Sequence, residues 1–242
     1  MNGDLLDRQT RLLTYLTSVS AIFDGPGDIR LDDALRGIDP RLLHLQASIS
    51  HQKRVKKISV IFPRTTALLT DRVAETLRDF ADVCPSMPAG FIENGRQFCD
   101  FLSLRRQAGT LRPPYLHEVA ACELAMAQAR AFVADEKAET SAKSLSNSKR
   151  RAPGVVLLRC VYDIQPIMTN AQNAEVVERD TPLAIVRPIG AEHAAIFELA
   201  PAVFNLLASL TDWAPVAPSF AMLASRALTH DLVECGLMEV RR

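Results

Sequence analysis

The sequence lacks the segments that carry a chain into or across a membrane. No apolar run approaches the roughly 20 residues of a membrane span. The N-terminus, from Met1 to Asp4, lacks the basic start and apolar block of a signal peptide. The cysteines are odd in number and scattered, unlike a disulfide framework: Cys84, Cys99, Cys122, Cys160 and Cys235. We therefore expect a cytoplasmic protein with reduced thiols and no membrane partner.

Net charge is also lacking. The 28 lysine and arginine residues are balanced by 28 aspartate and glutamate residues. A neutral chain has no global electrostatic attraction to nucleic acid or to anionic lipid. Because 48% of the residues are hydrophobic, a wholly disordered chain is excluded. The length of 242 residues is enough for one large domain or two small ones.

Local motifs for metal binding and covalent catalysis are absent as well. The five histidines form no HExxH or HxH pair, and the cysteines form no CxxC pair. No GxSxG elbow or GxxxxGK[ST] phosphate loop occurs, and Gly25-Pro26-Gly27 is typical of a turn. No neighbour in the sequence is placed to activate the thiol of Cys84. The sequence therefore predicts no catalytic residue, no metal ligand and no cofactor in this chain.

What the first part of the chain does contain is helical periodicity. Apolar residues from Leu5 to Phe23 fall on one side of a helix. Asp39-Pro40 has the form of an N-cap followed by proline at the first helical position. Further helices are predicted over 49–61, 64–69, 71–83, 95–104 and 115–135. Phe62-Pro63 and the prolines at 85 and 88 interrupt them.

The composition changes after this helical part. Residues 137–151 are serine-rich and polar, which is typical of a linker. Strands are predicted at 155–162, at 182–186, more weakly at 176–177, and at 237–240. Three helices are predicted at about 198–210, 219–228 and 229–235. The expected fold is therefore α+β, with an all-helical domain (1–136), a linker (137–153) and a small winged-helix-like module with a short β-sheet and three helices (154–242).

One basic cluster stands out within the neutral total. Four cations, Lys53, Arg54, Lys56 and Lys57, fall within five residues. On a helix they span more than half of the circumference, so they cannot all be buried. A solvated face is one interpretation of the cluster. The other is a docking surface for an acidic partner, an acidic peptide or a phosphate backbone.

The C-terminal module has two possible uses. A winged helix can read DNA through its third helix, but here Arg226 and His230 are offset by Asp231 and Glu234. The same architecture can hold an extended peptide by strand addition, which depends on backbone hydrogen bonds and apolar pockets. Peptide recognition fits the composition of the last helices better. A DNA-binding transcriptional regulator is the alternative, and an unrelated helical adaptor is a third possibility.

Four motifs occur in an order that resembles one bacterial family of helical proteins, a family that also carries a DNA-binding label. They are Ile49-Ser50-His51-Gln52-Lys53-Arg54 with Ile58, Ile61-Phe62-Pro63 and Leu68-Leu69; Gly95 to Leu102 with Phe98-x-x-Phe101-Leu102; Pro114-Tyr115-Leu116-His117-Glu118-Val119-Ala120-x-x-Glu123-Leu124-Ala125; and Ala200-Pro201-Ala202-x-Phe204-x-Leu206-Leu207. Together they cover most of the chain. The resemblance is to the HvfC and TglI partner subunits of multinuclear non-heme iron-dependent oxidative enzymes, and more distantly to MbnC. The TglI type, from 3-thiaglutamate biosynthesis, is favoured.

This resemblance implies a non-catalytic partner subunit. In such pairs the iron lies in a TIM-barrel enzyme, and the partner helps to hold a ribosomal precursor peptide whose cysteine is modified. The helical domain would then dock on the enzyme, with candidate docking residues His51, Lys53, Arg54, Lys57 and Tyr115. The peptide would add to the strand formed by Leu183, Ala184, Ile185 and Val186, under the helix that carries Arg226, His230 and Val233. Iron is expected in the partner enzyme and not in this chain.

Overall fold

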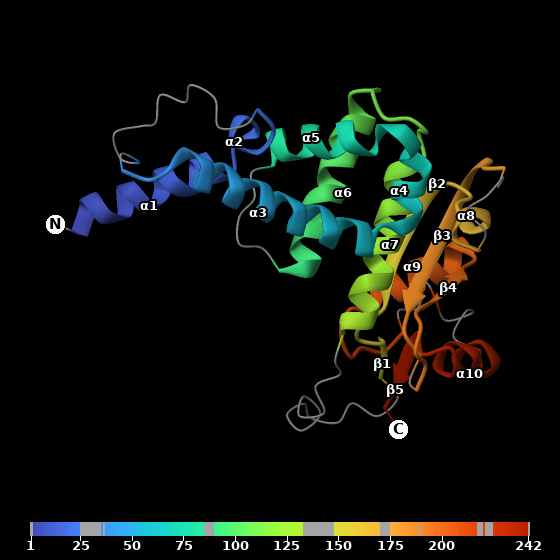
Figure 1. The fold of residues 1–242 in the computed structure, drawn as a ribbon. Helices are drawn as coiled ribbons and strands as arrows, with labels where there is room; N and C mark the ends of the chain where they lie inside the picture. The colour runs from blue at the N-terminus through green and yellow to red at the C-terminus, as the bar shows by residue number, and fades with distance from the viewer. Residues whose placement is uncertain are drawn as a thin grey trace. The chain divides into compact units, whose positions relative to one another are not determined.

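The computed structural model describes residues 2–24, 35, 37–84, 90–132, 148–169, 175–188, 190–216, 220 and 225–241. The fold is α+β, with helices and small antiparallel sheets (Figure 1). The chain forms two compact units, Met1–His117 and Glu118–Arg242. The units therefore divide inside a helix, earlier than the predicted boundary at residue 136. None of the described helices is both long and apolar enough to cross a bilayer.

The first unit is helical throughout its described part. Its elements are α1 (Asn2–Leu16), α2 (Val19–Phe23), α3 (Pro40–Ile61), α4 (Pro63–Leu69), the 3-10 turn η2 (Thr70–Arg72), α5 (Val73–Val83), α6 (Phe91–Gln107) and the start of α7 (Leu116–Ala131). The N-cap prediction is confirmed, because the Asp39 side chain accepts a hydrogen bond from the Arg41 N–H at 2.8 Å. The break at Phe62-Pro63 is confirmed too, since α3 ends there and α4 begins with the proline.

An aromatic cluster fills the core of this unit. Phe62 and Phe80 are both within 5.2 Å of the Phe98 ring, measured between ring centroids, and Phe80 lies 5.5 Å from Phe101. All four rings are at most 3% exposed. Aromatic contacts of this kind join the end of α3 to α5 and α6.

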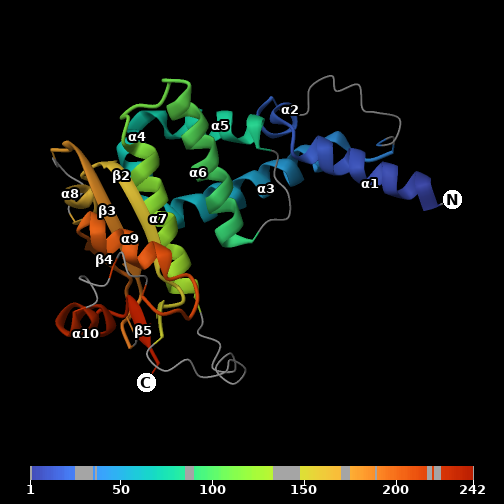
Figure 2. The same cartoon turned by 180° about the vertical axis from the view of Figure 1, so that it is seen from behind.

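The second unit is built on two antiparallel sheets. The larger sheet has the strand order β2 (Val156–Tyr162), β3 (Glu178–Val186), β4 (Ala195–Glu198). The smaller is a ribbon of β1 (Lys149–Arg151) and β5 (Met238–Val240). Both views show β2 and β3 running side by side (Figure 2). The remaining helices are α8 (Gln165–Thr169), α9 (Pro201–Ser209) and α10 (Arg226–Glu234).

The central strand β3 is buried on both of its faces from Thr181 to Val186. Ala184 and Val186 pack in a core with residues of α9 and α10, such as Leu206 and Leu232. Successive side chains of a strand point to opposite faces, so Leu183 and Ile185 lie on the other face. Those two residues are fully buried as well.

Two parts of the predicted architecture need correction. The predicted linker included residues 149–151, but these form β1, whose Arg150 is paired with Glu239 of β5 at 2.6 Å. The predicted strand near Val176-Val177 is not formed, because β3 begins at Glu178. The predicted helix at 219–228 falls largely outside the described residues. The strand β4 and the short helix α8 were not predicted.

Candidate functional site

The strand predicted to receive the peptide has no free edge. In β3, Leu183 and Ile185 are paired with β2 on one side and with β4 on the other. Ala184 and Val186 are also buried, and each of the four residues is at most 4% exposed. Strand addition needs unpaired backbone groups. The prediction that a peptide adds to Leu183–Val186 is therefore wrong, because both edges of that strand are already used.

One open backbone edge of the larger sheet belongs to β4. The Leu199 N–H donates to the Pro182 carbonyl at 2.9 Å. In an antiparallel pair the backbone N–H and C=O groups of every second residue point to the neighbouring strand, so this bond shows which residues of β4 bond to β3. By that alternation Ala195 and Phe197 bond to β3, whereas the peptide groups of Ile196 and Glu198 point away from the sheet. In the described part of the chain no hydrogen bond reaches these outward groups.

The opposite edge of the sheet is closed at one end by a side chain. The Glu118 carboxylate accepts hydrogen bonds from the backbone N–H groups of Val161 at 2.9 Å and of Tyr162 at 3.0 Å. Both donors lie at a register shift in β2 between Cys160 and Tyr162. A bulge and a capping carboxylate are recognised ways to protect an edge strand. An added strand therefore meets an obstacle at one end of the β2 edge, whereas no described side chain caps the backbone of the β4 edge.

The exposed face of α10 carries the other predicted peptide contacts. Arg226, His230 and Val233 are all exposed, whereas Leu232 of the same helix packs in the core with Ala184. No hydrogen bond joins these three residues to the sheet in the described part of the chain. They are thus available to a ligand from solvent, but the structure does not bring them together with residues 183–186 into one site.

Arg54, predicted to be a docking residue, is buried. It is 3% exposed, and its guanidinium lies 4.0 Å from the centroid of the Phe80 ring. One Nη atom donates to the Cys84 carbonyl, and the other donates to the Gln97 side chain at 3.2 Å. Its Nε has no hydrogen-bond partner. The docking prediction for Arg54 is wrong, because this cation joins the end of α5 to α3 and α6 inside the first unit.

The other predicted docking residues differ in accessibility. The His51 ring is half-buried and lies 5.0 Å, edge-on, from the Phe23 ring. Burial lowers the pKa of His51, and the positive charge of Arg54 lowers it further. Lys53 is exposed, whereas Lys57 and Tyr115 are partly buried and have interactions within the protein.

Exposed apolar side chains occur on two helices that pack against each other, α1 and α3. Five leucines on these helices are each more than half exposed: Leu5, Leu6, Leu13, Leu42 and Leu45. Exposed apolar side chains that gather in one region are typical of protein interaction sites. The spacing of apolar residues over 5–23 predicts an amphipathic helix. It does not show whether the apolar side packs against the rest of the protein or faces solvent.

The histidine and cysteine side chains are candidates for groups that could hold a metal ion. Within the described ranges, no group of three His, Cys, Asp or Glu side chains is placed to hold a metal ion. Burial raises the pKa of the half-buried Cys84 thiol, and the positive charge of Arg54 opposes that effect. Comparison of the sequence with models of known protein families finds no match, and comparison with curated proteins finds none either.

Proposed function

We propose that this chain is a partner subunit that binds a TIM-barrel, multinuclear non-heme iron oxidative enzyme and presents a ribosomal precursor peptide to it. The observation that carries the proposal is the open edge of β4, where the peptide groups of Ile196 and Glu198 point away from the sheet. An extended leader segment can add there as a fourth strand. In this proposal residues 154–242 act as a winged-helix-like peptide-recognition module.

The first unit supplies the surface for the enzyme. The exposed leucines of α1 and α3, such as Leu6 and Leu42, offer an apolar area that water contacts unfavourably. Exposed Lys53 adds a positive charge further along α3. The subunit contributes to the reaction by position, because it raises the effective concentration of the reacting cysteine at the iron of the enzyme. No step of the chemistry is assigned to a residue of this chain.

The resemblance of four sequence motifs supports the choice of the enzyme partner. Co-expression with a TIM-barrel iron enzyme encoded beside this chain, followed by co-purification and an iron assay, tests it. We expect a stable complex that contains iron and an iron-free chain when it is purified alone. Failure to form the complex, together with salt-sensitive DNA binding by this chain, would instead favour a transcriptional regulator.

A proline scan of the two sheet edges tests the peptide site. Ile196→Pro removes one outward N–H of β4, so we expect peptide affinity to fall at least about tenfold. Ile196→Ala serves as the side-chain control and is expected to stay within about threefold. Arg159→Pro removes an outward N–H of β2 and is the matched control for the other edge.

Calorimetric titration of the precursor peptide, with circular dichroism to verify folding, gives the readout. Equal binding by all three variants would exclude strand addition at β4. Loss of binding by Arg159→Pro alone would move the site to β2. Co-purification of each folded variant with the enzyme shows separately whether docking is unaffected.

A further inference from the structure

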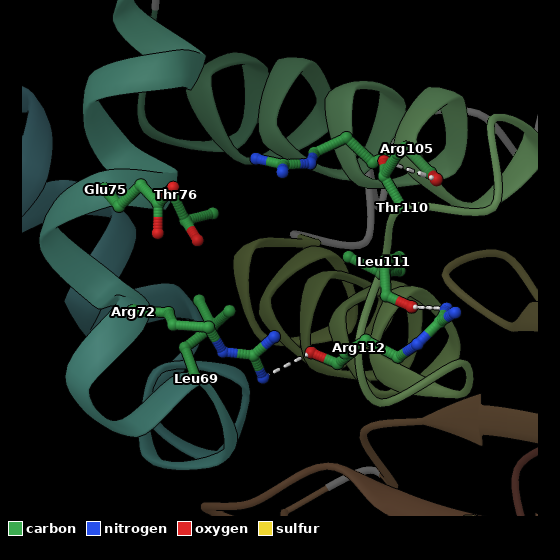
Figure 3. A pocket seen from close by; sticks show the side chains of 8 residues that line it. All are labelled: Leu69, Arg72, Glu75, Thr76, Arg105, Thr110, Leu111 and Arg112. Carbon is green, nitrogen blue, oxygen red and sulfur yellow. Dashed lines mark hydrogen bonds between the residues drawn. The ribbon is translucent and has the colours of Figure 1, made fainter.

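A small hollow in the first unit is lined by three arginines. Its volume is about 30 Å³, close to the space that one or two water molecules occupy. The lining residues come from the end of α4, from η2, α5 and α6, and from the segment before α7: Leu69, Arg72, Glu75, Thr76, Arg105, Thr110, Leu111 and Arg112 (Figure 3). This space fits one small polar group.

Backbone and side-chain acceptors hold the arginines in place. Arg72 Nη2 donates to the Arg112 carbonyl at 2.8 Å, and Arg105 Nη1 donates to Asp79 at 2.6 Å. Arg112 is turned back onto the carbonyls of Gly109 and Leu111 (Figure 3). A guanidinium has five N–H donors. Most donors of Arg72 and Arg105 are therefore left for another acceptor, and little side-chain entropy remains to be lost on binding.

The hydroxyl of Thr76 adds a further donor. Thr76 is 6% exposed, and within the described residues its side chain makes no hydrogen bond. A ligand atom or a water molecule in the hollow can accept a hydrogen bond from this hydroxyl. The side chain lies in the wall of the hollow (Figure 3).

The charges around the hollow favour an anion. Three arginines stand against two carboxylates, Glu75 in the lining and Asp79 beside Arg105. Glu75 is exposed and forms no ion pair with another described residue. Its negative charge opposes the entry of an anion. Neutralising Glu75 should therefore raise the affinity for an anion, whereas neutralising an arginine should lower it.

We propose that this hollow binds a single carboxylate group. Planar carboxylates match the fork of a guanidinium, and the remaining oxygen lone pairs can accept from Thr76. The carboxylate can come from a small free acid or from an Asp or Glu side chain of a docked protein, and both have the same chemistry. The inference concerns a site of the first unit and does not depend on the peptide site of the second unit.

Nuclear magnetic resonance of the arginine Nε–H groups in the full chain tests the proposal. Sodium acetate is titrated against sodium chloride of the same ionic strength, and an acetyl-Gly-Asp-Gly-amide peptide is titrated in parallel. We expect saturable shifts of the Arg72 and Arg105 signals with acetate and none with chloride. Tighter binding of the peptide than of acetate would identify a protein side chain as the source, and equal or weaker binding would identify a free acid.

Three variants decide the outcome. Arg72→Gln is expected to weaken acetate binding at least about tenfold, whereas Glu75→Gln is expected to strengthen it several-fold. Arg96→Gln is the matched control, because Arg96 is an exposed arginine of α6 outside the hollow, paired with Glu93. Shifts that grow linearly with either salt, or an unchanged affinity in Glu75→Gln and Arg72→Gln, would overturn the proposal.

Discussion

The buried carboxylate of Glu118, at the start of α7, bonds to the backbone N–H of Val161 in the bulge of β2 at 2.9 Å. The same carboxylate accepts from Tyr162 at 3.0 Å, so one side chain satisfies two donors of the sheet edge. Helix α7 and strand β2 are thereby joined within the second unit, and the polar groups of the bulge are not left without partners.

Replacement of Glu118 by alanine is expected to destabilise the second unit by about 2–4 kcal/mol, because two buried N–H groups lose their acceptors. The free energy of unfolding is measured by urea denaturation. Glu192→Ala, at an exposed position, is the control and should change stability by less than about 0.5 kcal/mol. If both variants are equally stable, the carboxylate does not support the bulge. Aggregation of Glu118→Ala is expected to rise as well, since the β2 edge is then open.

Arg54 provides a second prediction, because its charge is buried and none of the described carboxylates forms an ion pair with it. We expect Arg54→Lys to lose about 2 kcal/mol of stability, since an ammonium cannot reach both the Cys84 carbonyl and Gln97 while stacking on Phe80. Arg54→Met removes the buried charge and is expected to cost less than the lysine variant. Thermal unfolding of these variants is compared with that of Lys53→Met, whose exposed position should make it neutral. A destabilised Lys53→Met would contradict the distinction between the two neighbours.

These two residues show which parts of the structure could be predicted from the sequence. Local signals marked both ends of α3, where Asp39 caps the helix and Phe62-Pro63 ends it, but the predicted helix over 49–61 began nine residues too late, because one continuous helix runs from Pro40 to Ile61. The buried position of Arg54 was also readable, because Ala47, Arg54 and Ile58 fall on one helical stripe that the structure buries. The neighbouring cations Lys53, Lys56 and Lys57 give the same segment the composition of an exposed face.

The sheet was harder to predict. The run Leu-Ala-Ile-Val at 183–186 does not alternate, which is typical of a strand buried on both faces and hence central. The polar strand β1 depends on partners far along the chain, including the ion pair of Arg150 with Glu239 and the stacking of Arg150 on Trp213 at 4.5 Å. The β-propensity of a short segment gives no information about partners that lie far along the chain. The short strand β4, which forms the proposed peptide edge, was missed for the same reason.

His117 makes the stability of the protein dependent on pH. Burial and the positive charge of Arg106 lower its pKa from 6.5 to about 4, although the backbone of Pro114 opposes the shift. Arg106 donates to Nε2 of the ring at 2.6 Å, so the ring accepts there and is neutral. In the unfolded chain the ring binds a proton below pH 6.5, and in the folded chain it does so only below about pH 4. Folding therefore loses stability as the pH falls from 6.5 to 4.

The test for His117 is the difference between the wild-type chain and His117→Gln. We expect the wild-type free energy of unfolding to fall by about 1 kcal/mol more than that of the variant between pH 7 and pH 4, a value that allows for solvent screening of the partly exposed ring. Urea denaturation at several pH values gives both curves. Parallel curves over this range would show that the ring does not titrate differently in the folded state.

Gly154 is expected to be the glycine of the second unit that tolerates a side chain least. Its φ is +85°, and a Cβ atom there would lie 2.6 Å from Cδ1 of Phe132. Gly190 has a similar φ of +78°, but nothing lies within 4 Å of its Cβ position. Gly190→Ala therefore measures the backbone strain alone, and we expect it to lower the free energy of unfolding by about 1 kcal/mol.

Gly154→Ala adds the clash with Phe132 and is expected to lower the free energy of unfolding by about 2–3 kcal/mol. The double variant Gly154→Ala with Phe132→Ala removes the clash. The stability difference between this double variant and Phe132→Ala should therefore equal the loss caused by Gly190→Ala. Thermal unfolding of the four variants checks this. If the effect at 154 is the same with and without the Phe132 ring, the close approach of the ring does not select glycine, and the backbone angle alone does.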